Sequence, residues 1–217
     1  MFFCCILLHM ESLGKIFGSN DRVKIMRLFL FNDLVTFDID DIVKRTKTKK
    51  AETQKELKML TSIGFLRTKN FIKKIPKKTS KKDIKPEFKR IKKQGWILDK
   101  KFQLAEDLRV LLLDSELVKE KDIVQRIRKS GTIKLLVLSG IFTQDANRKI
   151  DLLIVGDNLK KDILVKQISI LESEIGRELA YAIFDQTEFE YRIRMYDKLI
   201  RDVVENKHIR LINSIIK

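Results

Sequence analysis

The chain has 217 residues, of which 44% are hydrophobic and 35% charged, with 8 glycines and 2 prolines. This composition excludes fibrous and intrinsically disordered proteins and allows one large domain or two small ones. The net charge of +16 is concentrated in residues 1–100, which carry 25 Lys and Arg against 11 Asp and Glu, whereas residues 101–217 carry 21 against 19. The asymmetry predicts a polyanionic partner for the first half. The alternative explanations of the charge excess are that the lysines only form a solvated surface, or that they reflect an A+T-rich genome.

The N-terminal run from Phe2 to Leu8 is apolar but too short to span a membrane, and it lacks the basic segment of a signal peptide. No other segment could cross a bilayer. Cys4 and Cys5 are adjacent and have no zinc-binding spacing, which favours a reducing, cytoplasmic compartment. We expect residues 1–9 to be non-native or disordered, with Met10 as the start.

Two helices are predicted before residue 50. Residues 19–31 begin with Ser19, Asn20 and Asp21, which favour a helix N-cap, and then place apolar residues on one helix face. Asp38 is a second capping residue, and the apolar residues after it recur at i, i+3 and i+4. A short second helix is therefore expected.

A third helix and a β-hairpin are predicted next. The helix spans 49–62 after a polar turn, and Gly64 is typical of a C-cap. Its buried residues are expected to be Ala51, Leu57, Leu60 and Ile63. The triplets Phe65-Leu66-Arg67 and Trp96-Ile97-Leu98 bracket a Lys-rich stretch and are predicted to pair as two strands.

Three helices and a hairpin together predict a winged helix-turn-helix, in which the third helix enters the major groove and the hairpin, or wing, lies on the backbone or minor groove. The predicted wing is 67–95, and residues 67–93 hold 13 Lys and Arg against 2 Asp and Glu. The alternative is a solvated loop that only aids solubility. Gln54 and Thr53 are expected to contact bases, and the lysines mainly phosphates. The predicted DNA-binding residues are Lys49, Lys50, Thr53, Gln54, Lys55, Lys58, Lys73, Lys74, Lys77, Lys78, Lys81 and Lys82.

Three segments carry a family resemblance: 22–29 (RVKIMRLF), 41–45 (DIVKR) and 56–66 (ELKML, then GFL). They resemble the winged-helix transcriptional regulators of the MarR/ArsR type. The resemblance implies the fold and binding to double-stranded DNA, but identifies no operator. Members of that class usually bind paired half-sites as dimers, so a homodimer is also expected.

The second half of the chain has an α/β pattern. Helices at 104–113 and 117–127 are expected within a helical linker, 103–130. Short runs of β-branched and apolar residues then predict buried strands. The expected strands are 133–138, 150–155 and 179–184, the expected helices are 159–175 and one or two within 187–204, and a short strand or turn follows at 209–212.

Residues 131–212 resemble the minimal nucleotidyltransferase domains that some prokaryotic regulators carry behind a winged helix. The resemblance rests on 138–142 (LSGIF) and 150–156 (IDLLIVG). In that family a Gly-Ser turn holds the nucleotide phosphate, and an Asp-x-Asp pair with a third carboxylate holds two metal ions, which offset the charge of the transferring phosphoryl group. Gly140 matches the Gly, and Asp151 matches the second Asp.

The rest of that metal motif is missing. Ile141 replaces the Ser, and Lys149 replaces the first Asp. Glu178 is near the third expected strand, yet Ala180 and Ala182 occupy its alternating positions without a carboxylate. One acid beside a lysine cannot hold two magnesium ions against their hydration. We therefore predict that the domain has lost its metal site, with no metal, cofactor or catalytic residue.

Gly140 and Asp151 are thus interpreted as a vestigial motif, with Asp151 a structural residue paired to Lys149 or Arg148. Such a domain would serve for dimerisation, for binding a protein partner, or for metal-free sensing of a nucleotide. The fold alone does not decide between these roles.

The predicted fold class is therefore α+β with two domains: a winged helix-turn-helix over 1–102, a helical linker over 103–130 and a nucleotidyltransferase-like α/β domain over 131–217. The predicted function is a sequence-specific, non-enzymatic transcriptional regulator that binds double-stranded DNA. The alternatives are an active nucleotidyltransferase with a nucleic-acid-binding domain, and an antitoxin-like module that binds RNA or protein.

Overall fold

The structure is a computed structural model that describes residues 8–76, 88–114, 120–145 and 147–215. In these residues the chain is an α+β protein that divides into two compact units, one of them Met10–Leu113 and the other containing Asp114–Lys217. The division falls inside the segment 103–130, which the sequence predicts as a linker. No helix in the described residues is both long and apolar enough to span a bilayer.

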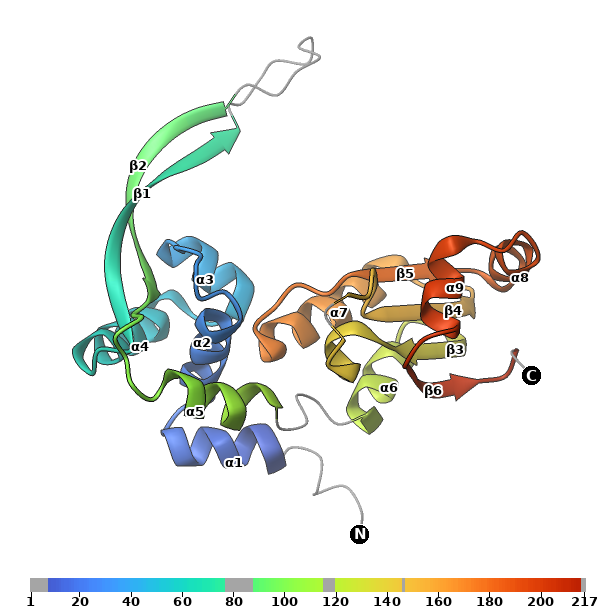
Figure 1. Ribbon diagram of the computed structural model, residues 1–217, viewed down its shortest axis with the longest axis horizontal. Coiled ribbons are helices and arrows are strands. Elements are labelled where there is room, and N and C mark those ends of the chain that lie inside the picture. The colour runs from blue at the N-terminus through green and yellow to red at the C-terminus, as the bar shows by residue number, and fades with distance from the viewer. Residues whose placement is uncertain (1–7, 77–87, 115–119, 146, 216–217) are drawn as a thin grey trace. The chain divides into compact units, whose positions relative to one another are not determined.

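The N-terminal unit contains α1 (Leu8–Phe17) from Met10 onward, and helices α2 (Asn20–Phe31), α3 (Ile39–Thr46) and α4 (Lys50–Ser62) (Figure 1). Both predicted caps are confirmed. The Ser19 hydroxyl accepts a hydrogen bond from the Asp21 N–H, and the Asp38 carboxylate accepts one from the Asp41 N–H, so that each satisfies a backbone donor at a helix start.

Helix α1 was not predicted from the sequence. Leu8 and His9, which fall in the segment expected to be non-native or disordered, begin this helix, and the expectation that the native chain starts at Met10 stays a prediction. Residues 1–7, including Cys4 and Cys5, lie outside the described residues, so the predictions made for them stay predictions.

Helix α4 packs against the rest of the unit with the side that carries Leu57 and Leu60. The predicted burial of these two residues is confirmed. The predicted burial of Ala51 and Ile63 is wrong. Ala51 lies on the exposed side of α4, and Ile63 follows the last helical residue and is 52% exposed. Gly64, with φ of +79°, provides the left-handed residue that ends the helix.

The predicted hairpin is present as β1 (Leu66–Pro76) and β2 (Phe88–Leu98), which pair antiparallel from Leu66 opposite Leu98 outward. Its base is joined to the residue before α3, because Phe37 and Trp96 exchange two backbone hydrogen bonds of 3.0 and 2.9 Å. Gly95 permits this approach: a Cβ atom there would lie 2.5 Å from the Phe37 carbonyl oxygen. Beyond its base the hairpin extends away from the helices as a long, curved ribbon (Figure 1).

Helix α5 (Ala105–Arg109) and the π-helix η1 (Val110–Asp114) follow the hairpin, and the N-terminal unit ends within η1, at Leu113. Arg27, which is fully buried in α2, donates from Nε to the Leu112 carbonyl oxygen at 2.9 Å. Arg109 donates to the carbonyl oxygen of Leu30, in the last turn of α2. The first part of the predicted linker therefore belongs to the N-terminal core, while its second part forms α6 of the other unit.

The C-terminal unit has a four-stranded sheet in the order β5-β4-β3-β6. Strands β4 and β5 are parallel, and the other two pairs are antiparallel. The described elements confirm the predicted pattern, with two helices where one or two were expected and a strand at the end. They are α6 (Glu120–Arg128), β3 (Thr132–Leu138), the 3-10 helix η2 (Gly140–Thr143), β4 (Leu152–Asp157), α7 (Lys161–Ile175), β5 (Tyr181–Phe184), α8 (Gln186–Arg194), α9 (Lys198–Val204) and β6 (Ile209–Asn213).

Both faces of the two central strands of this sheet, β3 and β4, are buried. Leu135 and Val155 lie on the face that packs against Phe189 of α8 and Ile200 of α9. The residues that alternate with them along β3 and β4 are equally buried, so the opposite face is covered as well. A continuous apolar run is what a strand buried on both faces requires.

Candidate nucleic-acid interface

The outward side of α4 is polar and rich in cations. Lys49, which precedes the helix, and Lys50 in its first turn are both exposed, and Gln54, Lys55 and Lys58 follow on the exposed side of the helix. These five predicted site residues therefore present amide and ammonium groups to solvent. Such groups can bind base edges and phosphates.

Thr53 is a correction to the predicted site. Its side chain is fully buried, and its hydroxyl is hydrogen-bonded to the hydroxyl of Thr48 at 2.7 Å and to the Lys49 carbonyl oxygen at 3.0 Å. Thr48 is in turn 2.8 Å from the hydroxyl of Thr46. Thr53 therefore holds the turn between α3 and α4 together and cannot reach a base.

A buried ion pair fixes α4 to α2. Glu56, whose side chain is 5% exposed, accepts a hydrogen bond of 2.6 Å from Nε of Arg22. Arg22 also donates to the Phe17 carbonyl oxygen at 2.5 Å, so its guanidinium joins the end of α1, α2 and α4. The ion pair between Glu56 and Arg22 therefore fixes the buried side of α4 and leaves its other side exposed.

The two faces of the hairpin differ in burial. Residues opposite each other in an antiparallel pair share a face. Phe71 pairs with Lys93 and Lys73 with Ile91, and all four side chains are half-buried. On the other face Ile72 pairs with Lys92 and Lys74 with Arg90, and all four are exposed. We call these the inner and the outer face.

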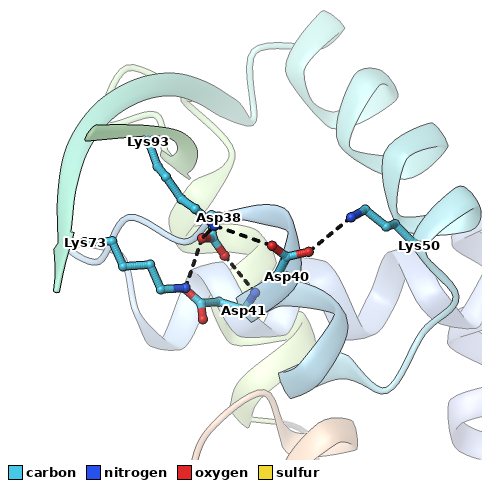
Figure 2. A network of polar contacts seen from close by, with 6 residues as sticks. All are labelled: Asp38, Asp40, Asp41, Lys50, Lys73 and Lys93. Carbon is cyan, nitrogen blue, oxygen red and sulfur yellow. Dashed lines mark hydrogen bonds and ion pairs between the residues drawn. The ribbon is translucent and has the colours of Figure 1, made fainter. Parts of the chain in front are cut away.

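On the inner face, three aspartates of α3 and its cap neutralise the lysines (Figure 2). Lys73 contacts the Oδ2 atoms of Asp38 at 2.9 Å and of Asp41 at 2.6 Å. Lys93 contacts Oδ2 of Asp38 at 2.7 Å and of Asp40 at 3.4 Å. Lys73 was predicted to bind DNA, but its ammonium group already contacts two carboxylates of the same chain.

The same cluster reaches the start of α4. Lys50 contacts the second oxygen of Asp40 at 3.1 Å, with both side chains about 60% exposed. Asp40 thus lies between Lys50 of α4 and Lys93 of β2 (Figure 2). Because this pair is open to solvent, its attraction is weak and a stronger anion could displace the carboxylate.

The pKa values of the cluster follow from these contacts. Burial disfavours the charged form of Asp38, but hydrogen bonds from Lys93, a backbone N–H of α3 and Lys73 outweigh it and hold the pKa of Asp38 well below its usual range. Burial also opposes the charge of Lys73, yet its bonds to aspartates raise the pKa of that lysine. The bond to Asp38 raises the pKa of Lys93. All of these groups are therefore charged at neutral pH.

On the outer face, the described part of the chain places no carboxylate against the cations. Lys74, Arg90 and Lys92 make no ion pair within the described part of the chain. The sequence prediction included Lys74 but missed Arg90 and Lys92. Alternation along the strands, counted from the predicted pairing of residues 65–67 with 96–98, would have placed all three on one face. The predicted residues Lys77, Lys78, Lys81 and Lys82 lie outside the described residues.

In the C-terminal unit Gly140 and Asp151, interpreted from the sequence as a vestigial motif, lie next to each other. Asp151 is buried, and its Oδ1 and Oδ2 accept hydrogen bonds of 2.9 Å from the backbone N–H groups of Ile141 and Ala180. Gly140 has φ of +56°, and a Cβ atom there would lie 2.3 Å from Oδ1 of Asp151. The carboxylate therefore ties the turn after β3 to the residue before β5.

The predicted pairing of Asp151 with Lys149 or Arg148 is wrong. Arg148 contacts Asp145 at 2.8 Å and Asp202 at 3.0 Å, and the Lys149 side chain is exposed. The backbone donors around Asp151 are nearer than either cation, because the left-handed turn at Gly140 folds the chain over the carboxylate.

Within the described residues, no three His, Cys, Asp or Glu side chains are grouped so that they could hold a metal ion. Comparison of the chain with protein-family models, with curated proteins and with solved structures finds no match.

Proposed function

We propose that the chain is a sequence-specific transcriptional regulator that binds double-stranded DNA through a winged helix-turn-helix, with α4 as its recognition helix and the hairpin as its wing. The observation that carries the proposal is the division of α4 into two sides. One side is fixed by Leu57, Leu60 and the buried carboxylate of Glu56, and the other presents an amide among ammonium groups.

The chemistry of that exposed side fits the major groove. The amide of Gln54 can donate to and accept from the edge of an adenine at the same time, which ammonium groups cannot do. Lys50, Lys55 and Lys58 flank it along the helix and bind phosphates or guanine acceptors. Phosphate contacts set the register of the helix, and Gln54 is the residue that reads sequence.

The wing adds affinity without reading sequence. Lys74, Arg90 and Lys92 on the outer face are exposed and pair with no carboxylate of the described residues, so each can release a counterion when it binds a phosphate. Binding should therefore fall steeply with salt. The concentration of positive charge in the first half of the chain supports this reading.

We further propose that the C-terminal unit is a non-catalytic, nucleotidyltransferase-like domain that serves for dimerisation, for binding a partner, or for sensing a nucleotide. Both oxygens of Asp151 already accept backbone hydrogen bonds, which supports a structural role for this carboxylate. Incubation of the protein with labelled ATP and magnesium, followed by a search for labelled product, tests whether the domain is non-catalytic. Any transfer that depends on Asp151 would contradict it.

The experiment for DNA binding starts by recovering the genomic sequences that bind the full chain. Replacement of Lys49, Lys50, Gln54 and Lys58 by Ala should then abolish specific binding to the recovered duplex. Because these side chains are exposed, the urea midpoint of the variant should match that of the parent. A matched variant with exposed cations changed in the other unit, Lys161, Lys166 and Lys198 to Ala, should bind as the parent does. Equal binding by the parent and the α4 variant would refute the proposal.

A further inference from the structure

Asp38 is a carboxylate in an unusual position. It is 2% exposed, although it lies where the hairpin passes α3. A buried carboxylate is costly unless hydrogen-bonded cations and donors surround it. Asp38 has three such partners from three segments: a backbone N–H of α3, Lys73 of β1 and Lys93 of β2 (Figure 2).

These partners make Asp38 a connection between both hairpin strands and the helical body. A two-stranded ribbon is only marginally stable by itself, so its direction depends on what holds it. The backbone bridge between Phe37 and Trp96 holds the base. Lys93 and Lys73 lie further along the ribbon, on its inner face, and the contact with Asp38 extends the attachment to that point.

We propose that Asp38 is the positioning residue that fixes the hairpin to α3, and that Lys73 and Lys93 are structural cations that leave phosphate binding to the outer face. The second half of this proposal rests on the proposed DNA binding, whereas the first half does not. If Lys73 and Lys93 moved from Asp38 to phosphates, the buried carboxylate would lose its cations. The free energy cost of that loss opposes the change of partner. Lys74 and Lys92 contact no carboxylate of the described residues, so their binding to phosphates carries no such cost.

The first test compares Asp38→Asn with Asp185→Asn. Each replaces an aspartate that caps a helix, and asparagine is an equally good cap, but only Asp38 also contacts lysines. Amide hydrogen exchange of β1 and β2, without DNA, should become about tenfold faster in Asp38→Asn and stay unchanged in Asp185→Asn. Unchanged exchange in Asp38→Asn would overturn the positioning role.

DNA binding by the same variant separates positioning from simple charge. Asp38→Asn makes the chain more positive, so electrostatics alone would tighten its binding to a duplex. Loss of hairpin position should instead weaken binding by about three- to tenfold. Tighter binding would overturn the proposal.

The second test compares two double variants of identical composition, Lys73→Met/Lys93→Met and Lys74→Met/Lys92→Met. Each removes one cation from β1 and one from β2 and keeps the apolar stems. The inner pair should speed hairpin exchange and leave the slope of log affinity against log salt unchanged. The outer pair should leave exchange unchanged and reduce that slope by about two.

A reduced slope for the inner pair would show that Lys73 and Lys93 contact phosphates, and would overturn the proposal. If the parent chain does not bind duplex DNA at all, the proposed function fails, and hydrogen exchange alone still decides whether Asp38 fixes the hairpin.

Discussion

Lys73 and Lys93 come from different strands but contact the same carboxylate oxygen, Oδ2 of Asp38, at 2.9 and 2.7 Å. The repulsion between two ammonium groups at one oxygen is offset only while that carboxylate and the neighbouring aspartates of α3 stay charged. The attachment of the hairpin is therefore linked to pH.

The N-terminal unit should lose stability in acid. The pKa of Asp38 is lowered in the folded chain, so its contribution is fully present above the ordinary aspartate pKa of about 3.9 and is lost as the pH falls below that value. Trp96, the single tryptophan of the chain, lies in β2 and reports unfolding of this unit by fluorescence. Urea titrations should give a free energy of unfolding that is flat above about pH 5 and falls below about pH 4. An equally steep fall in Asp38→Asn would contradict the assignment.

Glu56→Gln should destabilise the N-terminal unit by about 2 kcal/mol, because the amide loses the charge that pairs with the guanidinium of Arg22. Glu52→Gln, on the exposed side of the same helix, is the matched control and should change stability by less than about 0.5 kcal/mol. Urea unfolding followed at Trp96 measures both. Equal stability of the two variants would contradict a structural role for the pair.

Gly140→Ala should destabilise the C-terminal unit by at least about 1 kcal/mol. The residue has φ of +56°, and its new Cβ atom would meet Oδ1 of Asp151. Gly64→Ala shares the positive φ but meets no atom within 4 Å, so it shows the backbone cost alone. Circular dichroism during thermal unfolding compares the two. A cost for Gly140→Ala no larger than that for Gly64→Ala would mean that the chain can shift the carboxylate without loss.

Asp40→Asn should tighten binding to duplex DNA of any sequence by a few-fold, in contrast to Asp38→Asn. Asp40 is exposed and holds Lys50 and Lys93 only at the surface, so its removal frees Lys50 for phosphate and removes a repelling charge. Fluorescence anisotropy with a random duplex measures the effect. Weaker binding would show that Asp40 positions these lysines.

The elements of both units follow well from local patterns. Ser19 and Asp38 marked two helix starts, and the apolar runs after residue 132 marked the strands, because capping and periodicity act over a few residues. Helix α1 was missed, because its short sequence is joined to an apolar run that was read as non-native or disordered.

The site was harder to predict, because it depends on contacts between distant segments. The count of lysines in 67–93 indicated a polyanion partner but did not separate Lys73 from Lys74, which point to opposite faces of one strand. Thr53 was assigned to bases together with its neighbour Gln54, yet one step along a helix turns a side chain by about 100°, here from the buried side to the exposed one. Helical rotation could have excluded Thr53, whereas the ion pairs of Asp38 required the tertiary structure.

The most direct measurement is hydrogen exchange of the full chain with and without a saturating duplex recovered from genomic DNA. Binding through the recognition helix and wing predicts slower exchange in α4 and in both strands of the hairpin, with no direct protection of the sheet β5-β4-β3-β6. Protection confined to the C-terminal unit, or protection by single-stranded RNA but not by the duplex, would contradict the proposed interface.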